Sequence, residues 1–141
     1  PIFASASYAY TDVDGTDNAV HGLGGQVGGE VVTAEGLSWC LDGSFTHQWV
    51  DDIDADGQLY GADTSLGYTA GGGDVLVVPH ASVGVVHSTA NVGVLETSDT
   101  AARFAGGVTV GSRSVFVGGT VSYATFDNSD PVFGVGLGIV F

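Results

Sequence analysis

The chain has 141 residues, and its 16 acidic residues against only two basic ones, Arg103 and Arg113, give a formal net charge of −14. Such a charge repels a phosphate backbone and therefore excludes nucleic acid as a partner. A single cysteine allows no internal disulfide, and the length predicts one domain over residues 1–141.

The predicted elements are β-strands, because apolar residues recur at every second position along most of the chain. In residues 37–49 one face carries Leu37, Trp39, Leu41, Phe45 and Trp49, and the other carries small or polar residues. The last strand repeats this pattern, with glycines between its large apolar residues. In chain order we expect strands at 2–10, 20–32, 37–50, 58–70, 74–87, 99–110, 114–126 and 132–141.

The breaks between these strands alternate strictly between two kinds. Three are tight, at 34–36, 71–73 and 111–113, and the others are longer and mostly rich in Asp, at 11–18, 51–57, 88–99 and 127–131. Within the third long break, residues 92–95 could extend a strand. The alternation predicts an all-β fold, an eight-stranded antiparallel up-and-down transmembrane β-barrel with short turns at one end and acidic loops at the other.

The face on which the large residues lie should point outward into lipid. The opposite face is mostly Gly, Ser, Thr and Ala, which cannot build the apolar core of a water-soluble barrel. Trp39 and Trp49 are ten residues apart, which corresponds to roughly 24 Å along a tilted strand, and outer-membrane barrels have an apolar band of about 25 Å between aromatic girdles. We therefore expect an aromatic girdle formed by Trp39, Trp49, Tyr60, Tyr68, Phe133 and Phe141. The alternative is a soluble, lipocalin-like ligand-binding barrel with its bulky faces inward.

With its short turns, Asp-rich loops and the terminal run of residues 136–141, Gly-Leu-Gly-Ile-Val-Phe, the chain resembles the small outer-membrane β-barrel proteins, the group of the OmpA domain, OmpX and the opacity proteins. The resemblance implies a monomer in the lipid bilayer of a bacterial outer membrane. It also implies that the terminal aromatic residue is read by the outer-membrane insertion machinery. The chain departs from the group in lacking Lys, so that binding to lipopolysaccharide phosphates would need bridging divalent cations.

Two further expectations come from the composition and the start of the chain. The acidic excess is typical of a protein from a salt-adapted bacterium. The chain begins at Pro1, which we interpret as a mature or trimmed form whose export signal peptide has been removed.

One stretch matches the spacing of a calcium-binding loop. Its candidate ligands are Asp52, Asp54, Asp56, Gln58 and Asp63. Strands rather than helices flank the segment, so the alternative is an acidic hairpin loop. Calcium is the one possible cofactor.

Arg103 is the only basic residue expected inside the barrel. Glu30, Asp42 and also Asp63 fall on faces directed to the same lumen. A buried arginine needs a carboxylate partner, so these residues are expected to form lumen ion pairs that hold the strands together.

The function predicted from the sequence is a structural or surface-interaction role without catalysis, and no catalytic residue is assigned. The alternative is a lipid-modifying outer-membrane enzyme that uses His87 and Ser88. A histidine or serine oriented by a carboxylate at the lipid-facing rim would favour the enzyme, and the sequence shows no carboxylate placed to orient His87.

Overall fold

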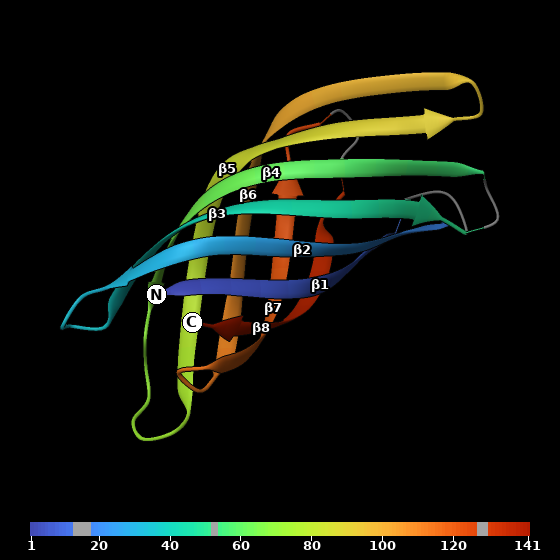
Figure 1. The fold of residues 1–141 in the computed structure, drawn as a ribbon. Coiled ribbons are helices and arrows are strands. Elements are labelled where there is room, and N and C mark those ends of the chain that lie inside the picture. The colour runs from blue at the N-terminus through green and yellow to red at the C-terminus, as the bar shows by residue number, and fades with distance from the viewer. Residues whose placement is uncertain (13–17, 52–53, 127–129) are drawn as a thin grey trace.

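The computed structural model describes residues 1–12, 18–51, 54–126 and 130–141. These residues form eight strands that follow one another around a closed barrel (Figure 1). No helix in this part of the chain is long and apolar enough to cross a membrane. The strands are β1 (Ile2–Asp12), β2 (Ala19–Val32), β3 (Leu37–Val50), β4 (Ala55–Tyr68), β5 (Leu76–Val92), β6 (Leu95–Gly111), β7 (Val115–Ala124) and β8 (Val132–Val140).

Every strand pairs antiparallel with its neighbours in the sequence, and β1 also pairs with β8. The closing register runs from Phe3 opposite Val140 to Tyr10 opposite Phe133. Both chain termini lie at the end that carries the short turns, next to each other in Figure 1. This arrangement confirms the predicted eight-stranded up-and-down barrel.

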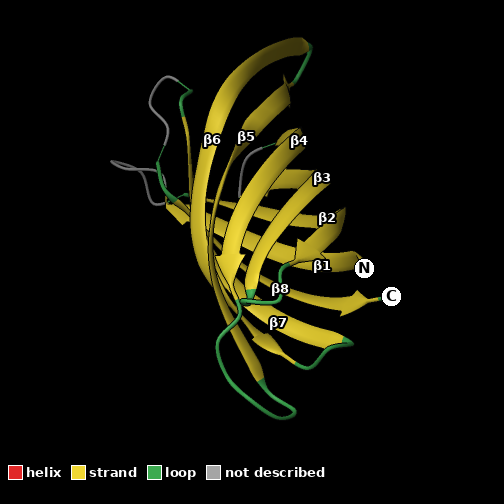
Figure 2. Cartoon of the chain, turned by 90° about the vertical axis from the view of Figure 1, so that its left-hand side faces the viewer, coloured by secondary structure: helices red, strands yellow, loops and turns green. Residues whose placement is uncertain are grey.

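The third long break is where the prediction was wrong. Residues 88–99 are not a loop, because β5 and β6 continue through them and meet at a tight turn in which Val92 pairs with Leu95. Gly93 occupies that turn with a φ of 60°, a conformation that glycine adopts without strain. In Figure 2 this β5–β6 hairpin rises beyond the other strands. Its polar residues, exposed on both faces, left no apolar alternation in the sequence to reveal it.

The two faces of the sheet are arranged as the alternation predicts. Trp39, Leu41 and Phe45 on β3 are exposed on the outside. Ser38 and Asp42, on the opposite face of the same strand, are only 1% and 7% exposed. The same holds for Leu137 and Ile139 on β8 and for Phe141, directly after it, which are all exposed. The lipocalin-like alternative required these bulky side chains to point inward, so their outward placement rules it out.

The lumen is filled differently along its length. Near the turn end, Phe3 and Phe116 meet edge-on, with ring centroids 6.3 Å apart and an interplanar angle of 76°. Gly138 lies directly opposite Phe116 across the β7–β8 pairing, and a Cβ at this position would overlap the Phe116 ring. Small residues facing the lumen therefore make room for a few large ones.

If the outer face contacts lipid, a charge in the middle of its apolar band is costly. Leu137 is 62% exposed and lies midway between Phe133 and Phe141, whereas Leu95 is 69% exposed at the tip of the β5–β6 hairpin. We predict that Leu137→Arg lowers the free energy of unfolding from lipid vesicles by roughly 2–4 kcal/mol. Leu95→Arg, measured by the same urea titration, should change it by less than about 0.5 kcal/mol. Equal losses for the two variants would contradict a lipid-facing band at Leu137.

Candidate functional site

The centre of the lumen holds an ion pair between β4 and β6. Nε of Arg103 donates to Oδ1 of Asp63 at 3.1 Å, and Nη2 donates to the second carboxylate oxygen of Asp63. Nη2 also donates to Oγ of Ser44 at 3.0 Å, which connects the pair to β3. Both charged side chains are largely buried, with exposed fractions of 19% and 7%. The guanidinium group thus joins three strands across the lumen.

Two glycines provide the space that this pair needs. Gly84 lies between Asp63 and Arg103 in the register of β4, β5 and β6, and a Cβ there would overlap the Asp63 carboxylate. A Cβ at Gly61 would likewise overlap the Arg103 guanidinium. A larger residue at either position would require the ion pair or its immediate surroundings to shift.

The prediction that Arg103 pairs with a lumen carboxylate is confirmed for Asp63 and is wrong for Glu30 and Asp42. Of the three lumen carboxylates, only Asp63 forms an ion pair with Arg103 among the described residues. Asp42 lies opposite Asp63 in the β3–β4 register, one strand further from Arg103. Glu30 lies opposite Cys40 on the far side of β3. The sheet register determines which carboxylate Arg103 reaches, and alternation alone does not reveal the register.

The candidate calcium ligands are not brought together. Asp63 points into the lumen towards Arg103, whereas Gln58 faces outward and accepts a hydrogen bond from the Tyr60 hydroxyl at 2.8 Å. Asp54 and Asp56 are exposed, and Asp52 lies outside the described residues. Among the residues that the structure describes, no three His, Cys, Asp or Glu side chains are grouped to hold a metal. Residues 55–68 form strand β4, in which side chains alternate between faces, so that Asp63 faces the lumen while Asp56 and Gln58 face outward.

The six predicted girdle residues all belong to the outward face. Trp39, Tyr60, Tyr68, Phe133 and Phe141 are among the exposed large side chains. Trp49 is partly covered, because it stacks against His21 on β2 and against its own strand neighbour His47, with centroid distances of 5.8 and 6.3 Å. The outer wall therefore carries aromatic rings towards both ends of the barrel.

The stacking around Trp49 belongs to a hydrogen-bonded cluster that the sequence did not reveal. The imidazole of His21 is bonded at both nitrogens, with Nδ1 2.5 Å from the Tyr8 hydroxyl and Nε2 2.7 Å from Oδ2 of Asp51. Tyr10 contacts the same ring edge-on, and its hydroxyl donates to Asp12. Tyr8 and Asp51 are 13 and 30 positions away from His21 along the chain, so only the pairing of β1, β2 and β3 brings them together.

His87 and Ser88 do not form a catalytic pair. Successive residues of a strand face opposite sides, and His87 is exposed on the outside while Ser88 is turned towards the lumen. Nδ1 of His87 is 2.8 Å from Oγ1 of Thr100 on β6. The His87–Ser88 basis for an enzyme is therefore wrong.

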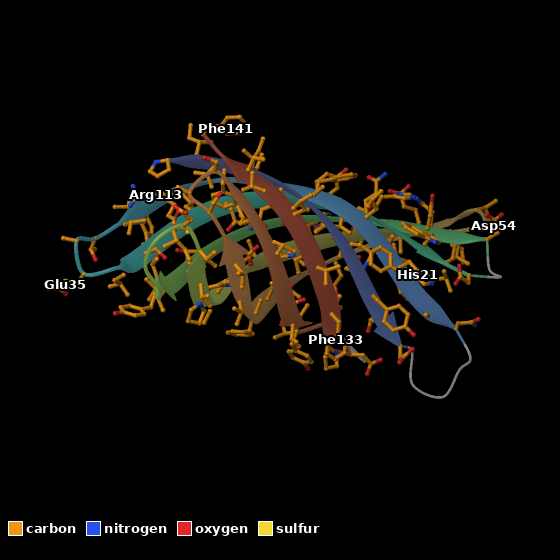
Figure 3. All side chains as sticks on the ribbon, turned by 90° about the horizontal axis from the view of Figure 1, so that it is seen from below. His21, Glu35, Asp54, Arg113, Phe133 and Phe141 are labelled. Atoms are coloured by element: carbon orange, nitrogen blue, oxygen red, sulfur yellow. The ribbon has the colours of Figure 1, made fainter. Side chains whose placement is uncertain are left out.

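Acidic side chains gather at the end of the barrel opposite the short turns. We call this end the acidic rim, and its described members are Asp12, Asp51, Asp54, Asp56, Glu96, Asp99 and Asp130. Neither arginine lies there, since Arg103 is in the lumen and Arg113 is in the turn between β6 and β7. Figure 3 shows this separation, with Glu35 and Arg113 towards one end and Asp54 at the other.

Comparisons with known proteins find the same fold. No protein-family model matches the chain, and no curated protein matches it in sequence. Among solved structures, the β-barrel domain of OprF from Pseudomonas aeruginosa has a TM-score of 0.73 at 18% identity, covering 99% of this chain and 96% of that one. Neisserial surface protein A gives 0.70 at 14% identity, with coverages of 99% and 96%. The outer-membrane enzyme PagL gives 0.64 at 15% identity, with 97% of each chain covered.

These neighbours confirm the predicted resemblance at the level of the fold. The chain has the architecture of the small outer-membrane barrels, and its apolar exterior suits a lipid bilayer. Because the same architecture includes an enzyme, the fold alone does not determine whether a barrel is catalytic.

Removal of the lumen cation should be far more damaging than removal of the surface cation. Arg103→Ala leaves Asp63 buried without its partner, so we predict a loss of roughly 3–5 kcal/mol in the free energy of unfolding. The control is Arg113→Ala, in an exposed turn, which should cost less than about 0.5 kcal/mol. Urea titration in lipid vesicles measures both. Similar small losses for the two variants would show that the Arg103–Asp63 pair does not stabilise the barrel.

Proposed function

We propose that this chain is a non-catalytic barrel of the bacterial outer membrane that contacts cationic partners through its acidic rim. The observation that carries this proposal is the separation of charge along the barrel. Carboxylates gather at the acidic rim, while the basic side chains lie in the lumen and at the opposite end. Such a surface attracts cations and positively charged polymers and repels anionic ones.

The β5–β6 hairpin adds a surface suited to contacts outside the membrane. Residues 91–100 are all exposed, and the hairpin carries Glu96 and Asp99 beyond the other strands (Figure 2). The pairing of β6 with β7 begins only at Arg103. Among the described residues, the part of β6 before Ala101 therefore pairs with β5 alone. An open strand edge offers backbone groups to an extended partner. Both features support an interaction role.

The second candidate function is lipid modification, and the cluster around His21 is what favours it. The Asp51 carboxylate orients His21 on the lipid-facing side of the acidic rim. A histidine oriented in this way is the feature expected of a lipid-modifying enzyme. Both ring nitrogens are already engaged, by Asp51 and by Tyr8, which leaves neither to activate a water or a serine. A hydrolase would release fatty acid from phospholipid or lipopolysaccharide, and His21→Ala would abolish the release. The proposed function predicts no release from either lipid.

Binding of a cationic probe tests the interaction role. We predict that a fluorescent nona-lysine peptide binds the barrel in lipid nanodiscs and that raising the salt concentration weakens binding. The double variant Asp54→Asn/Glu96→Gln should weaken binding between about twofold and thirtyfold, because each exposed carboxylate contributes roughly 0.2–1 kcal/mol. The matched control is Glu35→Gln/Asp74→Asn, which removes the same charges from exposed turns at the other end. Equal effects of the two double variants would contradict a role for the acidic rim.

A further inference from the structure

Asp42 is a buried carboxylate that the lumen ion pair leaves without a cation. It projects inward from β3, directly opposite Asp63 on β4, and is 7% exposed. Its Oδ1 is fully shielded from solvent and has no hydrogen-bond partner within the described protein. On β2, Gly28 lies opposite Asp42, and Gln26, the neighbouring inward residue, lies opposite Ser44. One oxygen therefore lies buried without a hydrogen-bond partner among the described residues.

The charges around Asp42 do not balance. Two carboxylates, Asp42 and Asp63, face each other across β3 and β4, and the single cation near them is Arg103. The guanidinium already has other partners, since Nε and Nη2 both donate to Asp63 and Nη2 also donates to Ser44. Burial of a carboxylate without a counter-charge is strongly unfavourable. When Asp42 is ionised, the centre of the lumen carries one more negative charge than the described side chains neutralise.

We propose that the lumen binds a monovalent alkali cation, Na⁺ or K⁺, at the Asp42 carboxylate. This inference goes beyond the proposed function and does not depend on it. Hard cations prefer oxygen ligands, and the inward residues next to Asp42 include Gln26, whose amide oxygen can serve as one. Ser44, opposite Gln26, already accepts a hydrogen bond from Arg103 through its hydroxyl oxygen. One cation of single charge neutralises the one excess carboxylate.

A divalent ion is disfavoured by the same surroundings. Among the described residues, no three acidic, histidine or cysteine side chains come together as metal ligands. Calcium sites use several carboxylates within a shell of six to eight oxygens, which this part of the lumen does not offer. The acidic rim raises the local concentration of small cations at one mouth, while Phe3 and Phe116 fill the lumen near the turn end. Cations would therefore enter from the rim.

The first test compares thermal unfolding in detergent micelles in two salts at equal ionic strength. NaCl or KCl supplies a cation small enough for the lumen, whereas N-methyl-D-glucamine chloride supplies one that is too large. Because a ligand that binds only the folded state stabilises it, the Tm of the wild-type barrel should be a few degrees higher in NaCl or KCl. Asp42→Asn should lose this difference, while the exposed turn variant Asp74→Asn should keep it.

Three results of this comparison would overturn the proposal. The first is a wild-type Tm that is the same in both salts. The second is an equal salt difference in wild type and Asp42→Asn, which would place the cation elsewhere. The third is a Tm that changes with pH in wild type but not in Asp42→Asn, and that is the same with either cation. This result would show that Asp42 holds a proton.

A structural measurement on the unaltered protein does not depend on how any variant folds. Thallium(I) mimics potassium and scatters anomalously, so crystals soaked in thallium acetate should show an anomalous peak at ligand distance from Oδ1 of Asp42. The same soak of Asp42→Asn crystals should show no peak there. A wild-type map without a peak beside Asp42 would contradict the site.

Discussion

The hydrocarbon core of a membrane contains nothing that can hydrogen-bond a peptide group, and this constraint shapes the whole molecule. Every strand in that region needs a neighbour on both sides, which the pairing of β1 with β8 provides by closing the sheet. The constraint ends where the barrel leaves the lipid. Among the described residues, the part of β6 before Ala101 has no strand neighbour on the β7 side, and it is there that most side chains become polar and the hairpin projects outward.

Closure also reverses the usual arrangement of apolar and polar residues. The large side chains are needed on the outside, so the lumen is left with small residues and a few polar groups. Polar groups in a lumen need partners. In this barrel Arg103 pairs with Asp63, and glycines such as Gly84 leave room for the pair. Arg103 pairs with neither Glu30 nor Asp42, and the buried, unpartnered Oδ1 of Asp42 is the reason to expect a cation inside.

Period-two alternation was enough to predict the fold, because a lipid-facing strand has to alternate wherever it crosses the membrane. It failed at residues 88–99, most of which, from 91 to 99, are exposed on both faces and therefore carry no apolar alternation. The candidate sites were harder to predict. Whether Arg103 reaches Asp63 or Glu30, and whether His21 meets Asp51, depends on the register of neighbouring strands, which one sequence does not reveal. A carboxylate close to its partner in space can be 30 or 40 residues away along the chain.

In a barrel that spans a bilayer, the bulky face of β3 lies against lipid. A nitroxide scan tests it most directly, with spin labels placed singly at each position from 37 to 49 in a barrel whose only native cysteine, Cys40, is otherwise changed to Ser. The collision rate with oxygen, which concentrates in lipid, is then measured in bilayers. The account predicts maxima at the odd-numbered positions, including Trp39, Leu41 and Phe45. Maxima at the even-numbered positions, or no period of two, would contradict it.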